Sequence, residues 1–147
     1  MRVFAQRETL TLDLAEILRT TRRYFEATLE VIEASQERDS ARVELTDARH
    51  GFRGTFSLST RAVSEQDLTD ARLAEERGRA GGMSMLAARC KTIWLLETIG
   101  PDSELARLNL CAILAAVALG PVLPDDNSTL FGVRGAMERL EKKRKGA

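Results

Sequence analysis

The feature that most constrains the fold is an uncharged stretch that runs from Leu108 to Pro124, LNLCAILAAVALGPVLP. Its continuous apolar part, residues 110–119, is about ten residues long, whereas a helix that crosses a bilayer needs about 20. Pro121 then ends any helix, because proline cannot donate the next backbone hydrogen bond. The stretch therefore predicts a central helix that other elements cover on all sides, and no membrane span.

The length and charge of the chain favour one globular domain and weigh against some functions. The chain has 147 residues, of which 44% are hydrophobic and 30% are charged, as is typical of one globular domain. It carries 22 basic and 22 acidic residues, so its net charge is zero. Neutralisation of phosphates supplies most of the affinity of nucleic-acid binders. A balanced charge therefore weighs against a dedicated nucleic-acid-binding protein.

The cysteines and the first residues indicate a compartment. Cys90 and Cys111 lie in apolar patterns without a CxxC pair, which predicts two reduced, buried thiols. The first residues, MRVFAQRETLTLDL, have no apolar segment of the kind that a secretory signal needs. We therefore expect a cytoplasmic protein.

Apolar residues at three- and four-residue steps predict about five helices. Asp13 begins the first with capping-box spacing, Ser64 begins the second, and Gly100 followed by Pro101 ends the third. Trp94 and Ile113 are expected to lie on antiparallel neighbouring helices. The expected helices cover residues 13–36, 64–78 and 84–100, the uncharged stretch after residue 103, and a last helix that follows a cap at Asp126 or Ser128 and ends in EKKRKG.

One segment changes to a two-residue period. In residues 41–60, Val43 and Leu45 alternate with polar residues, and so do the apolar residues after the turn sequence DARHG. This pattern predicts a β-hairpin with one apolar face. A lone hairpin is marginal in water, and a third strand could come from residues 1–8 or from a second copy of the chain.

The sequence thus predicts an α+β fold that is predominantly α-helical, with about five helices and one β-hairpin at residues 41–60. We expect a single domain over residues 1–147. Within it, residues 1–62 hold the first helix and the hairpin, residues 78–82 form a glycine-rich hinge, and residues 84–143 form a helical core.

No residue pattern points to catalysis, a cofactor or a metal. His50 is the only histidine and lies in the predicted turn, and neither cysteine has a partner at ligand spacing. Phosphate-binding GxxxxGK and nucleophile-elbow GxSxG motifs are absent. The sequence therefore favours a non-enzymatic protein without a cofactor.

Two groups of residues are candidates for contacts with a partner. The first pairs aromatic anchors with an arginine rim, as protein interfaces often do. The second is a basic run that would suit phosphates, but it lacks the aromatic residues on which bases stack. The candidate interface is Arg19, Arg23, Tyr24, Phe25, Phe52 and Phe56, and the basic run is Lys142, Lys143, Arg144 and Lys145.

The leading hypothesis is a cytoplasmic interaction or adaptor module that forms a homodimer and binds another protein. One alternative is a nucleic-acid-associated regulator that uses the basic spots at residues 19–23 and 142–145. Another is a small-molecule-binding protein or enzyme with a pocket between Trp94 and the hairpin phenylalanines. No membrane partner is expected.

Overall fold

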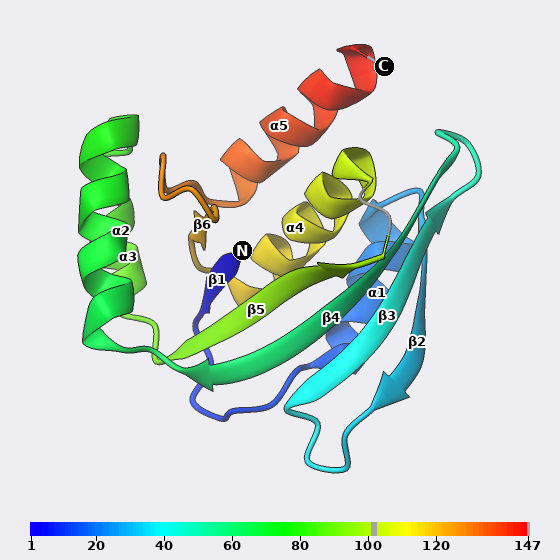
Figure 1. Cartoon of the computed structure of the whole chain (residues 1–147), viewed down its shortest axis with the longest axis horizontal. Coiled ribbons are helices and arrows are strands. Elements are labelled where there is room, and N and C mark those ends of the chain that lie inside the picture. Colours follow the sequence, from blue (N-terminus) through cyan, green and yellow to red (C-terminus); the bar gives the residue numbers. More distant parts are fainter. Residues whose placement is uncertain (101–102, 147) are drawn as a thin grey trace.

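The fold is built on an antiparallel sheet with the strand order β2-β3-β4-β5-β1-β6 (Figure 1). The computed structural model describes residues 1–100 and 103–146. Its strands are β1 (Arg2–Ala5), β2 (Thr28–Ala34), β3 (Ser40–Asp47), β4 (Phe52–Ala62), β5 (Thr92–Ile99) and β6 (Val122–Leu123). Its helices are α1 (Leu14–Tyr24), α2 (Glu65–Gly78), α3 (Met83–Ala88), α4 (Glu104–Ala118) and α5 (Val133–Gly146).

The predominantly helical class with one hairpin is therefore wrong, because two expected helical segments are strands. The first helix ends at Tyr24, and residues 28–34 pair with β3 as β2. The segment around Trp94 is β5, which pairs with β4 and β1 in the middle of the sheet. Its sequence, TIWLLETI, is rich in the β-branched and aromatic residues that suit strands. The helical core expected at residues 84–143 thus contains two strands, β5 and β6.

The hairpin at residues 41–60 is confirmed as β3 and β4, joined through the turn after Asp47. Gly51 has a φ of 68°, a conformation that glycine adopts without strain. The strands beside this hairpin are β2 and β5. β1 pairs with β5 and β6 rather than with the hairpin. Neither source expected for a third strand lies beside the hairpin.

The helices cover the two faces of the sheet unequally. Val3 and Trp94 point to the face that packs on α1 and α4, whereas Phe4 and Ile93 point to the face under α2 and α3, because side chains alternate along a strand. Helix α5 lies beside α4, away from the sheet (Figure 1). The expectation for the uncharged stretch is confirmed, since residues 109–115 are all buried in α4.

Two sets of contacts hold elements that are distant in the sequence against β1: the close approach of Gly120 and the ion pairs of Asp67. At Gly120 a Cβ atom would lie 1.9 Å from the carbonyl oxygen of Phe4, so only glycine fits this approach to β1. The Asp67 side chain, 2% exposed, joins the start of α2 to β1 and β4 through Arg2 at 2.8 Å and Arg61 at 2.6 Å. Burial opposes ionisation of Asp67, but these contacts and Ser64 hold its pKa well below the ordinary value.

The glycine-rich stretch connects α2 to α3. Arg79 ends α2 in the left-handed conformation, and Gly82, with a φ of 89°, begins α3. β4 and β5 lie on either side of this stretch in the sequence and are neighbours in the sheet. The sequence predicts that Gly100 followed by Pro101 ends a helix, and Pro101 lies outside the described residues.

Candidate interaction surface

The structure divides the residues of the candidate interface between the surface and the core. Arg19, Arg23 and Tyr24 lie on the last turns of α1, where Tyr24 is 68% exposed. The phenylalanines belong to the hydrophobic core and are almost fully buried, at 7%, 7% and 0% exposure: Phe25, Phe52 and Phe56. Tyr24 is therefore the one aromatic residue of this set that a partner can reach.

The exposed end of α1 combines this aromatic ring with cations. The guanidinium of Arg23 lies 5.3 Å from the centre of the Tyr24 ring, and Arg19 pairs with Glu16 at 3.0 Å. An arginine beside an aromatic ring is a common feature of protein interfaces. Arg19, Arg23 and Tyr24 are thus exposed together near the end of α1, and their contact with a partner stays a prediction.

Strand β2 follows Tyr24 closely and forms one edge of the sheet. Within the described chain it pairs only with β3, so its outer edge presents unpaired backbone groups. Leu29 and Val31 pack partly on the core. A bulge between Val31 and Glu33 leaves Ile32 outside the regular pairing, with 51% exposure. The sequence reasoning missed this edge, although the alternation in TLEV was a signal for it.

The acidic side chains on and beside β2 have basic neighbours within their own sheet. Glu33 pairs with Arg42 at 2.8 Å, and Glu26 pairs with Arg49. The hydrogen bond from Arg53 to Glu44, together with a weaker effect of Glu30, raises the pKa of Arg53 above its usual value. The charge of the β2 edge is therefore largely compensated.

The basic run lies on the last turns of α5. Lys143 pairs with Glu104 of α4 at 2.8 Å, and Lys142 and Lys143 line a groove beside α4. Four consecutive helical residues point in directions about 100° apart, so Lys142–Lys145 do not form one basic face. Nucleic-acid binding stays a prediction from the sequence.

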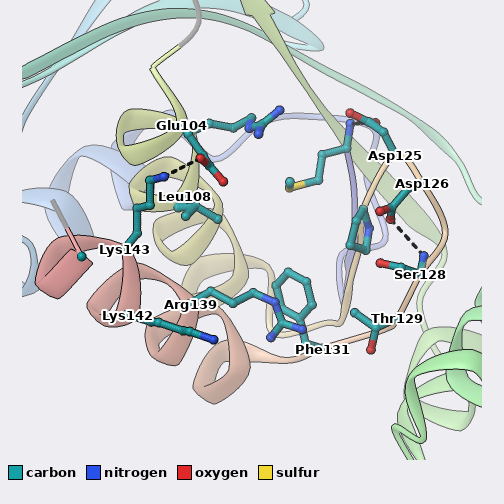
Figure 2. A pocket seen from close by; sticks show the side chains of 14 residues that line it. Glu104, Leu108, Asp125, Asp126, Ser128, Thr129, Phe131, Arg139, Lys142 and Lys143 are labelled. Carbon is teal, nitrogen blue, oxygen red and sulfur yellow. Dashed lines mark hydrogen bonds and ion pairs between the residues drawn. The ribbon is translucent and has the colours of Figure 1, made fainter.

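The pocket expected near Trp94 is filled by protein. Trp94, Phe52 and Phe56 are buried in the core. A groove of about 630 Å³ lies elsewhere, between α4, α5 and residues 124–131 (Figure 2). A small-molecule site would therefore have a different lining from the predicted one.

His50 has a local partner in the hairpin turn. Its ring Nδ1 lies 2.7 Å from the Asp47 carboxylate, which also accepts the backbone N–H of His50 at 3.0 Å. Burial opposes ionisation of Asp47, but these hydrogen bonds lower its pKa below the usual value. The pair closes the turn between β3 and β4, which accounts for a histidine at this position.

Both cysteines are buried and unpaired, as the sequence predicts. Burial raises the pKa of Cys90 to about 11 and that of Cys111 to about 12. Both thiols are therefore protonated near neutral pH and are poor nucleophiles. The described residues hold no cluster of three or more His, Cys, Asp or Glu side chains that would suit a metal ion.

No family model, curated protein or solved structure matches this chain. Among the residues with described positions, no helix is both long enough and apolar enough to cross a membrane.

Proposed function

We propose that this chain is a non-enzymatic, cytoplasmic protein–protein interaction module that forms a homodimer through the edge of β2. The observation that supports it is the unpaired outer edge of β2, a strand that carries the exposed Ile32 and follows the exposed Tyr24 in the sequence. An open strand edge is a ready template for pairing with another strand. Two buried, free thiols suit a reducing compartment.

A second copy of the chain is the occupant that the charges favour. In an antiparallel β2–β2 pair the same patch serves both partners about a two-fold axis, and the two sheets become one. Such pairing brings like charges together, and this opposes association unless the charges are compensated. Here Glu33 already pairs with Arg42, and Glu30 lies near Arg53, within each sheet.

The apolar anchors give the pairing its expected strength. Ile32 is 51% exposed, so burying the rest of its side chain is worth about 1 kcal/mol in each copy. Tyr24 adds aromatic area with Arg23 at its rim. Backbone pairing with a few such anchors is consistent with a dimer that dissociates in the micromolar range.

The test compares one substitution at two exposed apolar positions. Ile32→Lys places a charge on the β2 edge, and Leu73→Lys makes the same change on α2, where Leu73 is 43% exposed. Light scattering at micromolar concentration should report twice the chain mass of 16.3 kDa for the wild type and for Leu73→Lys. Ile32→Lys should report a monomer.

A wild-type mass of one chain over the whole accessible concentration range would overturn the homodimer. Equal dissociation of both variants would show that β2 is not the interface. Phe25→Glu and Phe52→Glu do not serve this test, because both side chains are core residues whose replacement by a charge would disrupt folding.

A further inference from the structure

The groove beside α5 has the size and the lining of a small-molecule site. This open groove has a volume of about 630 Å³, within the range of about 300–1,000 Å³ that is usual for ligand pockets. Helices α4 and α5 form one wall and residues 124–131 form the other (Figure 2). The apolar part of the lining consists mainly of Met1, Leu108, Pro124 and Phe131.

One wall holds a guanidinium in a fixed position. The guanidinium of Arg139 lies 3.8 Å from the centre of the Phe131 ring and donates a hydrogen bond to the carbonyl oxygen of Gly135 at 3.1 Å. An arginine has five N–H donors, so most of those on Arg139 remain available to a ligand. A guanidinium held on an aromatic ring is preorganised to bind an oxyanion.

A second cation lies next to it on the same helix. Lys142 lines the groove and has no ion pair or hydrogen bond within residues 1–100 and 103–146. In Figure 2 the side chains of Arg139 and Lys142 extend from α5 in the same direction. Lys143, by contrast, is paired with Glu104 at 2.8 Å. Two adjacent cations suit a doubly charged anion better than a carboxylate.

The facing wall holds two carboxylates, Asp125 and Asp126, together with the amino group of Met1. The Asp126 carboxylate accepts the backbone N–H of Ser128 at 3.0 Å, and hydrogen bonds from Ser128 lower the pKa of Asp126. Asp126 is therefore ionised at neutral pH and keeps lone pairs for further donors. Asp125 beside it pairs with the amino group of Met1 at 2.5 Å. The groove thus has two cations, Arg139 and Lys142, on α5 and the Asp126 carboxylate on the facing wall, while Glu104 and Arg107 of α4 also line it.

We propose that this groove binds a small phosphomonoester that carries hydroxyl or amino donors away from its phosphate. A phosphomonoester has a charge of about −1.5 to −2 at pH 7, which matches Arg139 and Lys142. Its donors reach Asp126, and its apolar or planar middle lies over Leu108 and Phe131. A nucleoside monophosphate has all three parts.

The test uses calorimetric titration of the full chain with AMP and with inorganic phosphate. AMP should bind more tightly than phosphate, because it also reaches Asp126 and the apolar lining. Arg139→Gln and Lys142→Gln should each weaken both probes, Arg139→Gln by at least about tenfold, since a charge-assisted hydrogen bond is lost. Arg134→Gln is the matched control, because Arg134 is 93% exposed on the same helix and pairs with Glu138.

Asp126→Asn separates the two ends of the site. It should weaken AMP and leave the affinity for inorganic phosphate equal or higher, because a negative charge is removed. The proposal would be overturned if neither AMP nor inorganic phosphate showed saturable binding. So would equal affinity for AMP and phosphate, or an Arg134→Gln effect as large as that of Arg139→Gln. Lys142→Gln does not remove a packing contact, so its result does not depend on a change in folding.

Discussion

Replacement of Asn109 by leucine should stabilise the protein. Asn109 is 0% exposed in α4, and neither atom of its carboxamide has a hydrogen-bond partner among the residues that the structure describes. A buried polar group without a partner costs about 1–3 kcal/mol of stability. Leucine has the same branched shape and fills the same space with methyl groups, and it favours a helix by a further few tenths of a kcal/mol.

We therefore expect Asn109→Leu to raise the free energy of unfolding by about 1–3 kcal/mol. Urea denaturation followed by circular dichroism measures it, and an unchanged m-value would show that the unfolded state is unaltered. The chain's second asparagine is the control. Asn127 accepts a hydrogen bond from Arg2 at 3.0 Å and has a φ of 53°, so Asn127→Leu should destabilise.

The opposite result for Asn109 would refute this reasoning. If Asn109→Leu lowered stability by more than about 1 kcal/mol, the carboxamide would have to make hydrogen bonds that stabilise the native state. Asn109→Ala distinguishes shape from polarity. It also removes the polar group but leaves a cavity, so its stability should lie below that of the leucine variant by about 2 kcal/mol or more.

Three further outcomes follow from the core. Gly120→Ala should cost about 3 kcal/mol in urea denaturation, because its Cβ would clash with the Phe4 carbonyl oxygen; a cost below about 1 kcal/mol would contradict that approach. Cys90 and Cys111, with pKa values of about 11 and 12, should resist thiol reagents at pH 8 until the protein unfolds, and rapid native labelling would disprove their burial. Asp67→Asn should cost about 3 kcal/mol, because it removes the buried carboxylate that pairs with both Arg2 and Arg61. Folding lowers the pKa of Asp67, so the stability from its ionised form is present above its unfolded pKa of about 4 and is lost as the pH falls further. In urea titrations, the free energy of unfolding of Asp67→Asn should therefore fall less between neutral and acid pH than that of the wild type.

Elements whose signals are local could be predicted from the sequence. The Ser64 hydroxyl and the Asp67 carboxylate form the reciprocal cap at the start of α2, and the Asp13 carboxylate accepts the N–H of Glu16 at the start of α1. Both caps depend on residues three apart in the chain. The hairpin and α4 were also found, because a turn sequence and a long apolar run identify them without tertiary information.

The two strands that were mistaken for helices depend on distant partners. Phe25, Leu29 and Ile32 have helical spacing, yet residues 28–34 pair with β3. β5 is paired on both edges, and helices cover both faces of its first part, where Ile93, Trp94 and Leu96 are buried and the sequence is apolar without alternation. Periodicity alone cannot distinguish such a strand from a buried helix. Pairing with residues far away in the sequence decides between them.

The groove had no sequence signal, because its lining comes from separated segments. Arg139 is fixed by Phe131, whereas Leu108 belongs to another helix and Asp126 to a loop. No fixed spacing joins these residues into a motif. The basic run drew attention to the end of α5, but the residue with the best-defined geometry, Arg139, precedes that run.

The proposed dimer edge and the proposed ligand groove can be tested independently because of the strand order. β2 is one edge of the sheet, and β6, whose following segment forms a wall of the groove, is the other. Four strands separate them, so pairing of two copies at β2 leaves the groove open. Ile32→Lys should therefore lower the mass in solution without changing the affinity for AMP. Arg139→Gln should lower the affinity for AMP without changing the mass in solution. If a single substitution changed both readouts, the cause would be a loss of native structure, which the urea midpoint of the same variant measures directly.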